Sequence, residues 1–359
     1  MERGSTMKNQ LLGRSFIFGI VVLFFGASAA SAFNVEQSLS PQPMNRGNTL
    51  YVGGSGSGNY TTIQEAINNA TNGDTVFVYN KTYNENVDTK LKKIILIGED
   101  RDTTIITGPA TNPVVRIGTS DTTLSGFTLI GTSTGTIIQV ASLSENVFIT
   151  NNLIKNGANG IMLSPTTSKA TITDNTIVDN AFVGIQLQTS SYNVIRDNRI
   201  ENNEAQGIDL SFGSNHNSIL NNSLIDNGEE AILISGITST ENTISGNNIS
   251  SNKIGVRFSS AGSNKIQSNN IQGSVMEGIL LQSSKENSIE KNNFIDNKRQ
   301  AAFKFSSRNS WDANYWSNWI GFKLTRPLFQ KFPKAIGGLL LINLDRHPAK
   351  IPYNISTFA

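Results

Sequence analysis

Apolar and amide residues recur along the middle of the chain with a period of 22–25 residues. In each repeat an isoleucine is followed three residues later by an asparagine, and two residues after that by a second apolar residue. The isoleucines are Ile149, Ile172, Ile195, Ile219, Ile244, Ile266 and Ile289. A fixed period in this range is typical of a solenoid, in which each repeat buries its apolar face against its neighbours.

Each repeat also contains a second apolar pair, two residues apart and preceded by glycine or alanine. The pairs are Ile161/Leu163, Ile185/Leu187, Ile208/Leu210, Ile232/Ile234, Val256/Phe258, Ile279/Leu281 and Phe303/Phe305. Side chains two residues apart share one face of a strand, so the varied residues between them are expected to face solvent. These are Met162, Gln186, Asp209, Leu233, Arg257, Leu280 and Lys304.

No segment between these positions has the length and 3.6-residue spacing that a helix in every repeat would need. Three short strands per repeat predict an all-β fold, a right-handed parallel β-helix of about ten coils. We assign it to residues 61–305, preceded by a spacer at 33–60 and followed by an aromatic C-terminal cap at 306–359.

The recurrent asparagines are predicted to be scaffold. They are Asn152, Asn175, Asn198, Asn222, Asn247, Asn269 and Asn292, with a second column at Asn193, Asn217, Asn242, Asn264 and Asn287. Asparagine tolerates the left-handed backbone region at tight bends. Stacked one per coil, the amides can hydrogen-bond along the helix axis, and an unpaired one would cost ~1–3 kcal/mol.

The start of the repeats resembles pectin-lyase-like β-helix proteins. Thr62 and Glu65 form a capping box ahead of a predicted capping helix, and the segments 73–78, 82–87 and 94–98 follow as strand and turn. The repeats are similar to the NosD/CASH branch, named for carbohydrate-binding proteins and sugar hydrolases. This resemblance implies a carbohydrate or cell-envelope glycan as partner.

The tail also resembles NosD-type proteins, through Trp311, Trp316 and Trp319 and the later pair Pro352–Tyr353. The aspartate-rich stretch that often lies between these elements is absent, so the resemblance gives no calcium site here. We expect the tryptophans to plug the last coil, and a sugar-stacking platform is the alternative.

Residues 1–32 have the pattern of a secretory signal peptide, with a basic start, an apolar run and the cleavage pattern Ala30–Ser31–Ala32. We therefore expect a secreted, cell-surface or periplasmic protein; the alternative is a signal retained as an anchor. The chain has no cysteine, which excludes disulfides and thiolate metal sites.

The formal net charge is +2, with basic residues concentrated after residue 290. Lys323, Arg326, Lys331 and Lys334 could contact an anionic envelope surface, and the alternative is a solvated cap. A nucleic-acid partner is not expected for an exported chain.

Polysaccharide hydrolysis needs two carboxyl groups beside one glycosidic bond. The candidates are Asp174 and Asp197, which hold equivalent places in adjacent coils, ~5 Å apart if in register. Arg196 and Arg199 lie beside them and could bind a uronate. The alternative is a pair of turn aspartates next to structural asparagines.

A second candidate group is Tyr192, His216 and Glu241, which precede three successive isoleucines by three residues. These side chains could bind carbohydrate or simply be solvated. The run Glu99–Asp102 offers carboxylate oxygens of the kind calcium binds, although it also fits an ordinary loop. Copper is disfavoured, because cysteine is absent and His216 and His347 are far apart in sequence.

We therefore expect an exported module that binds carbohydrate without catalysis and without a cofactor. The alternative is a polysaccharide lyase, hydrolase or epimerase with a divergent site, and the third hypothesis is a NosD-like accessory or structural envelope protein.

Overall fold

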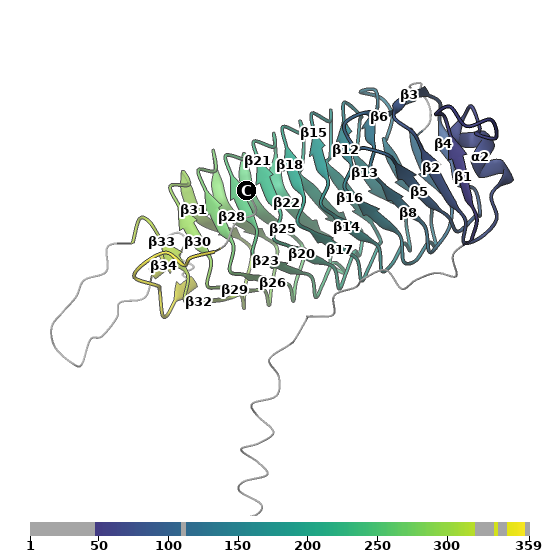
Figure 1. Cartoon of the computed structure of the whole chain (residues 1–359). Coiled ribbons are helices and arrows are strands. Elements are labelled where there is room, and N and C mark those ends of the chain that lie inside the picture. Colours follow the sequence, from purple (N-terminus) through teal and green to yellow (C-terminus); the bar gives the residue numbers. More distant parts are fainter. Residues whose placement is uncertain (1–46, 109–112, 320–333, 337–342, 356–359) are drawn as a thin grey trace, which may run out of the picture. The chain divides into compact units, whose positions relative to one another are not determined.

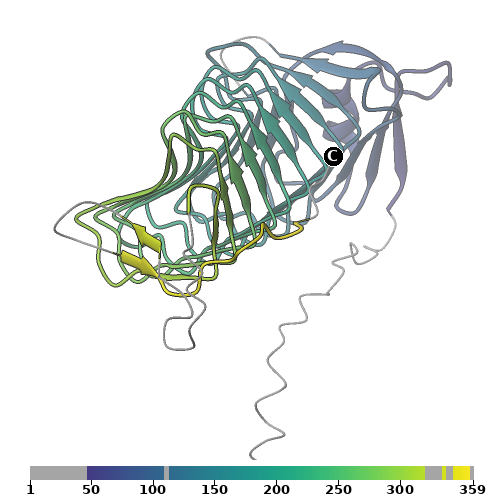
Figure 2. The same cartoon turned by 90° about the vertical axis from the view of Figure 1, so that its left-hand side faces the viewer.

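A computed structural model describes residues 47–108, 113–319, 334–336 and 343–355. The predicted signal peptide and the basic residues Lys323, Arg326 and Lys331 lie outside the described residues. Successive coils stack in parallel, and most of them contribute one strand to each of three sheets (Figure 1). A view turned by 90° shows the coils one behind another (Figure 2). The predicted parallel β-helix is confirmed.

Sheet A has fourteen strands. In spatial order they are β1 (Thr49–Val52), β2 (Thr75–Val78), β5 (Ile95–Gly98), β8 (Thr123–Ser125), β11 (Phe148–Thr150), β14 (Thr171–Thr173), β17 (Val194–Arg196), β20 (Ser218–Leu220), β23 (Thr243–Ser245), β26 (Lys265–Gln267), β29 (Ser288–Glu290), β32 (Ser310–Asp312), β35 (Asn343–Asp345) and β34 (Lys334–Ile336). All pairs are parallel except β34 with β35.

Sheet B has eleven strands, so the described residues form about eleven coils, against the ten expected. They are β3 (Lys81–Asn84), β6 (Thr104–Thr107), β9 (Thr128–Ile130), β12 (Leu153–Lys155), β15 (Thr176–Val178), β18 (Arg199–Glu201), β21 (Ser223–Ile225), β24 (Asn248–Ser250), β27 (Asn270–Gln272), β30 (Asn293–Ile295) and β33 (Tyr315–Trp316).

Sheet C has ten strands and becomes wider toward the C-terminus. They are β4 (Val87–Asp88), β7 (Val115–Ile117), β10 (Ile138–Val140), β13 (Ile161–Leu163), β16 (Ile185–Gln188), β19 (Ile208–Ser211), β22 (Glu230–Ser235), β25 (Ile254–Ser259), β28 (Glu277–Gln282) and β31 (Arg299–Lys304). The last four strands have six residues each, whereas β7, β10 and β13 have three.

The core is one continuous column of apolar side chains between the three sheets. The predicted isoleucines align from coil to coil, as Ile172 pairs with Ile195 and Ile195 with Ile219. All three are fully buried. Because every coil repeats this contact, the column excludes water along the whole β-helix.

A short helix, α2 (Ile63–Asn69), lies at the N-terminal end of the β-helix in Figure 1. Thr62 accepts a hydrogen bond from the Glu65 amide, as the capping box predicts. The amides of Ile63 and Gln64 are bound by Glu85, at 2.9 Å each. Two of the orphan N–H groups at the helix start are thus satisfied by a residue more than twenty positions away.

The strands extend past the predicted boundaries. Strand β1 lies inside the range assigned to the spacer and pairs with β2 along its whole length. Strands β32 and β33 lie inside the range assigned to the cap and pair with β29 and β30. The sequence does not predict these strands, because they lack the repeated isoleucine and asparagine positions. Their backbones nevertheless pair in register with the neighbouring strands.

The last predicted apolar pair, Phe303/Phe305, is wrong in its register. Phe303 aligns with Leu281, so Ala301 and Phe303 hold the inner positions of β31. Phe305 is 90% exposed and has a φ of 52°, in the left-handed turn position that Ser283 holds one coil earlier. The apolar character of Phe305 does not reflect burial.

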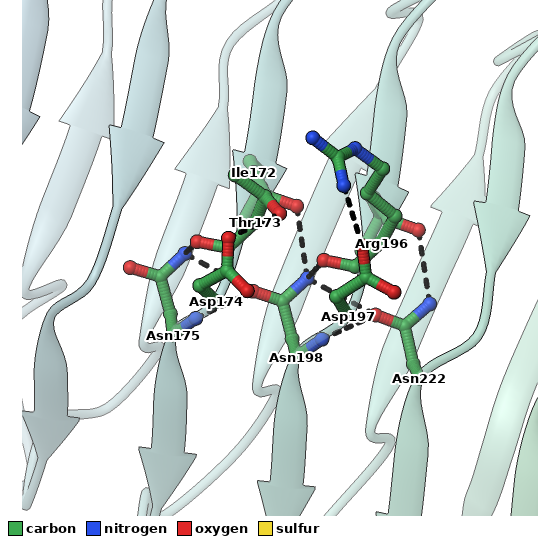
Figure 3. Close-up of polar contacts among 9 residues, drawn as sticks. Ile172, Thr173, Asp174, Asn175, Arg196, Asp197, Asn198 and Asn222 are labelled. Atoms are coloured by element: carbon green, nitrogen blue, oxygen red, sulfur yellow. Dashed lines mark hydrogen bonds and ion pairs between the residues drawn. The ribbon is translucent and has the colours of Figure 1, made fainter. Parts of the chain in front are cut away.

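Both asparagine columns form continuous ladders of hydrogen bonds, as predicted. Each rung accepts the backbone and side-chain amides of the preceding rung at one carbonyl oxygen; Asn198, for example, accepts both from Asn175 at 3.0 Å. The left-handed residue is not the ladder asparagine but the residue before it, as at Asp174 and Asp197 (Figure 3). The asparagine holds the turn through its amide, and its neighbour makes the bend.

A third ladder, absent from the predictions, lines the turn between sheets B and C. Its members are Asn180, Asn203, Asn227, Asn252 and Asn297. Ser274 interrupts it between the last two, which is why the sequence pattern is harder to see.

Candidate functional site

The predicted aspartates occupy turns between sheets A and B. Asp174 is exposed and accepts a hydrogen bond from the Thr173 hydroxyl at 2.9 Å. Asp197 forms an ion pair with its neighbour Arg196 at 2.5 Å (Figure 3). Arg199 pairs instead with Glu201. Each of the two aspartate carboxylates therefore contacts the residue that precedes it in its own coil.

The column that contains these aspartates is defined by backbone geometry. The equivalent residues Asn151, Asn221, Lys291 and Ala313 share a φ between 53° and 56°. Side chains of such different chemistry at one position indicate a turn requirement. The turn geometry thus accounts for the backbone at Asp174 and Asp197, and a catalytic role for the two carboxylates stays a prediction.

The trio Tyr192, His216 and Glu241 is brought together at the turn before sheet A. The Tyr192 and His216 rings stack, with centroids 4.7 Å apart and planes at 22°. His216 Nε2 lies 2.8 Å from Glu241 Oε2, and its Nδ1 lies 2.9 Å from Asn215 Oδ1. Three exposed side chains in successive coils form one contiguous surface group, whose role as a binding site remains a prediction.

The acidic loop at Glu99–Asp102 uses its carboxylates internally. Asp100 Oδ1 accepts the amides of Asp102 and Thr103 and the Thr103 hydroxyl. The hydroxyl bond is the largest of the effects that hold the pKa of Asp100 below its usual value. Glu99 accepts the Asn80 amide, and Asp102 pairs with Arg101. This geometry is that of a hydrogen-bonded turn.

A different group of charges lies on the outer face of sheet C, where the sequence predicted only solvent-facing residues. Asp209 in β19 is 9% exposed, and Glu230 in β22 is 2% exposed. Arg257 Nη1 lies 3.0 Å from Glu230 Oε1, and Gln206 donates to Glu230 Oε2 at 2.9 Å. Gln186 donates to Asp209 Oδ2 over 3.4 Å. We call Asp209, Glu230 and Arg257 the sheet C cluster.

Burial raises the pKa of Asp209 to about 6, and the nearby Glu230 carboxylate adds to the rise. The Gln186 amide and the nearby Ser211 hydroxyl act in the opposite direction without cancelling it. A buried carboxylate with a strongly perturbed pKa and a defined charged neighbour is typical of functional sites.

Two polar atoms of the sheet C cluster have no hydrogen-bond partner in the described part of the chain. They are the acceptor Asp209 Oδ1 and the donor Arg257 Nε. Leu233 lies between these two residues in the sheet register, and its side chain is partly exposed. Buried polar atoms are rarely left unpaired, so an acceptor and a donor on either side of an apolar residue point to a ligand. Both atoms lie beneath the surface, so their side chains must turn outward for a ligand to reach them.

The surroundings of the sheet C cluster are partly apolar. Ile254, Leu280 and Ala302 form a small buried group on the same outer face, separate from the core. Phe212 directly follows β19 and is 73% exposed, with a φ of 55° that is unusual for a bulky residue. Ile237, just beyond β22, is 82% exposed.

Sequence reasoning missed the sheet C cluster because Asp209 occupies a position that is partly exposed in most coils. Glu230 stands at the start of β22, just before the apolar pair of its repeat, and nothing in its local sequence shows that it reaches the same face. The available signal was the sign of charge: Asp209 is the only acidic residue among the seven middle positions of the apolar pairs.

Residues 93–240 match the family model described as "Right handed beta helix region". Residues 228–321 match the model described as "Periplasmic copper-binding protein (NosD)". The chain folds as a right-handed parallel β-helix, and its residues 228–321 are similar to the NosD model.

Two curated plant proteins resemble parts of this β-helix protein. The probable pectinesterase/pectinesterase inhibitor 12 of Arabidopsis thaliana is 37% identical over 109 residues, which are 29% of this chain and 18% of that protein. Pectinesterase 2 of Citrus sinensis is 46% identical over 63 residues, 16% of this chain and 12% of that protein. The chain therefore spans less than a fifth of the curated relatives it matches.

Solved structures match over more of the β-helix. The A-module of the mannuronan C-5 epimerase AlgE6 of Azotobacter vinelandii is 17% identical, with a TM-score of 0.59 over 81% of this chain and 92% of that one. The Dettilon tailspike protein is 16% identical, with a TM-score of 0.63 over 75% and 62% of the two chains. At these identities the likeness shows the fold alone.

The copper named for the NosD model does not fit the described residues of this β-helix protein. No group of three or more His, Cys, Asp or Glu side chains in that part of the chain could hold a metal ion. His216 and His347 are bound separately, by Glu241 and by Asp312. We derive no copper chemistry from this donor set.

Proposed function

We propose that the chain is an exported β-helix that binds a polysaccharide along the outer face of sheet C without turning it over. The observation that carries this proposal is the unpaired acceptor Asp209 Oδ1 and the unpaired donor Arg257 Nε on either side of Leu233. A sugar ring presents apolar C–H groups on its face and hydroxyl groups at its rim. Its hydroxyls can both donate and accept hydrogen bonds.

The neighbouring residues support a long ligand. Exposed Phe212 and Ile237 follow adjacent strands of sheet C, at the edge of the same face. Exposed apolar side chains beside buried polar groups are typical of binding sites. Because the coils repeat along the axis, an extended polymer could contact several of them at once.

The bonding of Glu230 supports binding rather than hydrolysis. A glycosidase needs two carboxyl groups available to its substrate. Both Glu230 oxygens are engaged, one by Arg257 and one by Gln206, and only Asp209 has an unpaired oxygen. The raised pKa of Asp209 nevertheless supports a second candidate, a lyase, hydrolase or epimerase in which Asp209 transfers a proton.

Export is part of the proposal. It is supported by the signal-like sequence of residues 1–32 and by the periplasmic description of the NosD model. None of the helices that the structure describes is both long and hydrophobic enough to span a bilayer. The basic C-terminal residues are proposed to contact an anionic envelope surface, in addition to the glycan site.

A glycan array with the full chain, followed by assays for released reducing ends and for unsaturated or epimerised products, tests the proposal. We expect binding to at least one polysaccharide and no turnover. Leu233→Lys should abolish binding, because it places a positive charge under the sugar ring. Leu91→Lys is the matched control, since Leu91 is 80% exposed in the turn between β4 and β5.

Two further variants separate the possible faces. Truncation of Tyr192 or Arg199 should weaken binding only if the ligand lies on the turns around sheet A. If the wild type turns over a polysaccharide and Asp209→Asn abolishes this turnover, the function at sheet C is catalysis and not binding alone. Turnover that Asp174→Asn removes would instead place catalysis at the predicted aspartates.

A further inference from the structure

The sheet C cluster carries one negative charge without a counter-charge. Glu230 is neutralised by Arg257, whose second guanidinium nitrogen Nη2 donates to Gln282 at 2.9 Å. Among the ion pairs formed by described residues, none includes Asp209. The cluster thus contains two carboxylates and one guanidinium.

Asp209 and Glu230 are close enough to affect each other's charge. The Coulomb interaction with Glu230 is one cause of the raised pKa of Asp209. An isolated buried carboxylate is costly, and a ligand that brings a positive charge would remove that cost. A ligand carboxylate at the same place would add a third negative charge.

We propose that the polysaccharide bound at sheet C contains a free amino sugar, whose ammonium group pairs with the Asp209 carboxylate once that side chain turns Oδ1 toward the surface. This inference rests on the proposed function and specifies its ligand class. The ammonium has three donors, one of which would satisfy the orphan oxygen. Its charge would complete the pairing of the two buried carboxylates with two cations.

The Arg257 end of the sheet C cluster fits the uncharged hydroxyl and ring oxygens of the same ligand. Asp209, Leu233 and Arg257 lie on three adjacent strands, β19, β22 and β25. The two orphan atoms therefore belong to residues about 10 Å apart across the sheet, which is two strand spacings. A hydroxyl or ring oxygen beyond Leu233 would accept the hydrogen bond of Arg257 Nε. The site thus selects a donor at one end and an acceptor at the other.

Titration calorimetry of the full chain with three hexasaccharides tests this inference. The probes are a chitosan hexamer with free amines, its fully N-acetylated counterpart and a hexagalacturonate, at about pH 6.5 so that Asp209 is mostly ionised. We expect the chitosan hexamer to bind at least about tenfold more tightly than either of the others. Asp209→Asn should remove this preference.

The control is Asp226→Asn, which makes the same change of charge on an exposed turn in the adjacent coil and should keep the preference. If Asp209→Asn does not fold, the salt dependence of the wild type decides. Added salt should weaken binding of the chitosan hexamer and leave the N-acetylated one nearly unchanged.

Equal or tighter binding of the N-acetylated or uronate hexamer overturns the inference and leaves polysaccharide binding intact. Failure of all three probes, together with failure of every glycan on the array, overturns the proposed function and this inference with it.

Discussion

Asn314 donates both its backbone amide and its side-chain amide to a single oxygen of Asp345, at 2.9 and 3.1 Å. The first asparagine ladder therefore ends on a buried carboxylate supplied by a strand from the C-terminal segment. The indole N–H of Trp316 donates to the same oxygen at 3.0 Å. The tail closes the hydrogen-bond column of the solenoid as well as packing against it.

We predict that Asp345→Ala lowers the free energy of unfolding by about 2–4 kcal/mol, since it leaves three buried donors without an acceptor. Asp345→Asn should cost less, because its amide oxygen can still accept from Asn314. Urea denaturation followed by circular dichroism measures both. The proposed ladder end is refuted if the two substitutions shift the midpoint equally.

The ladder interior gives a second prediction. Asn198 is 1% exposed, accepts two hydrogen bonds from Asn175 and donates two to Asn222 (Figure 3). Asn198→Leu should destabilise the fold by about 1–3 kcal/mol, because both neighbouring rungs lose a partner. Thr176 directly follows the rung Asn175 and lies outside the ladder, so Thr176→Ala should do little. Similar denaturation midpoints for the two variants would contradict a structural ladder.

The interruption of the third ladder gives a stabilising prediction. Ser274 is buried, and its hydroxyl has no partner among the described residues. A Cβ at Gly184 would lie 3.2 Å from the side-chain amide of Asn203, so a glycine at this place leaves space for the ladder asparagine of the next coil. Gly255 holds the equivalent place in the coil before Ser274. Ser274→Asn should therefore restore the ladder and stabilise the protein by about 0.5–1.5 kcal/mol.

Thermal unfolding of Ser274→Asn beside Ser283→Asn measures this gain. Ser283 is exposed in a left-handed turn, where asparagine is well tolerated, so that control adds the same amide outside the ladder. A melting temperature for Ser274→Asn at or below that of the wild type would show that the site cannot hold the rung.

The fold could be predicted because a solenoid repeats one local rule in every coil. The spacing from Ile172 to Asn175 and Ile177 specifies two strands and the turn between them, and the same spacing recurs one coil later. The rule fails where one coil departs from it. Phe305 is apolar but faces solvent. Ser274 replaces an asparagine of the third ladder, so the spacing of that ladder is harder to recognise in the sequence.

The sheet C cluster could not be predicted in this way. Its members stand in different coils and in different parts of the repeat: Asp209 lies mid-strand, and Glu230 lies at the start of a lengthened strand. Their proximity depends on the register between coils and on side-chain burial. The pair Asp174 and Asp197 was easier to see because both occupy one repeated position, and a repeated position here reflects scaffold geometry.

The titration of Asp209 gives the last prediction. Its pKa rises from 3.8 to about 6 on folding, chiefly through burial. The folded state therefore holds this proton more tightly than the unfolded chain does. The stability associated with Asp209 is complete below about pH 4 and is lost as the pH rises through about 6. At pH 8 the ionised, buried carboxylate destabilises the fold by about 1–3 kcal/mol relative to acid.

Asp209→Asn removes this titration while keeping the shape of the side chain. The stability of the variant relative to the wild type should therefore rise by that amount between pH 4 and pH 8, with most of the change between about pH 4 and 6. Free energies of unfolding from urea titrations at unit pH steps measure the difference. Asp226→Asn corrects for the change in net charge, since Asp226 is exposed at a turn. A difference between Asp209→Asn and the wild type that stays constant across this range would mean that Asp209 is solvated, and the basis for a ligand site at sheet C would be lost.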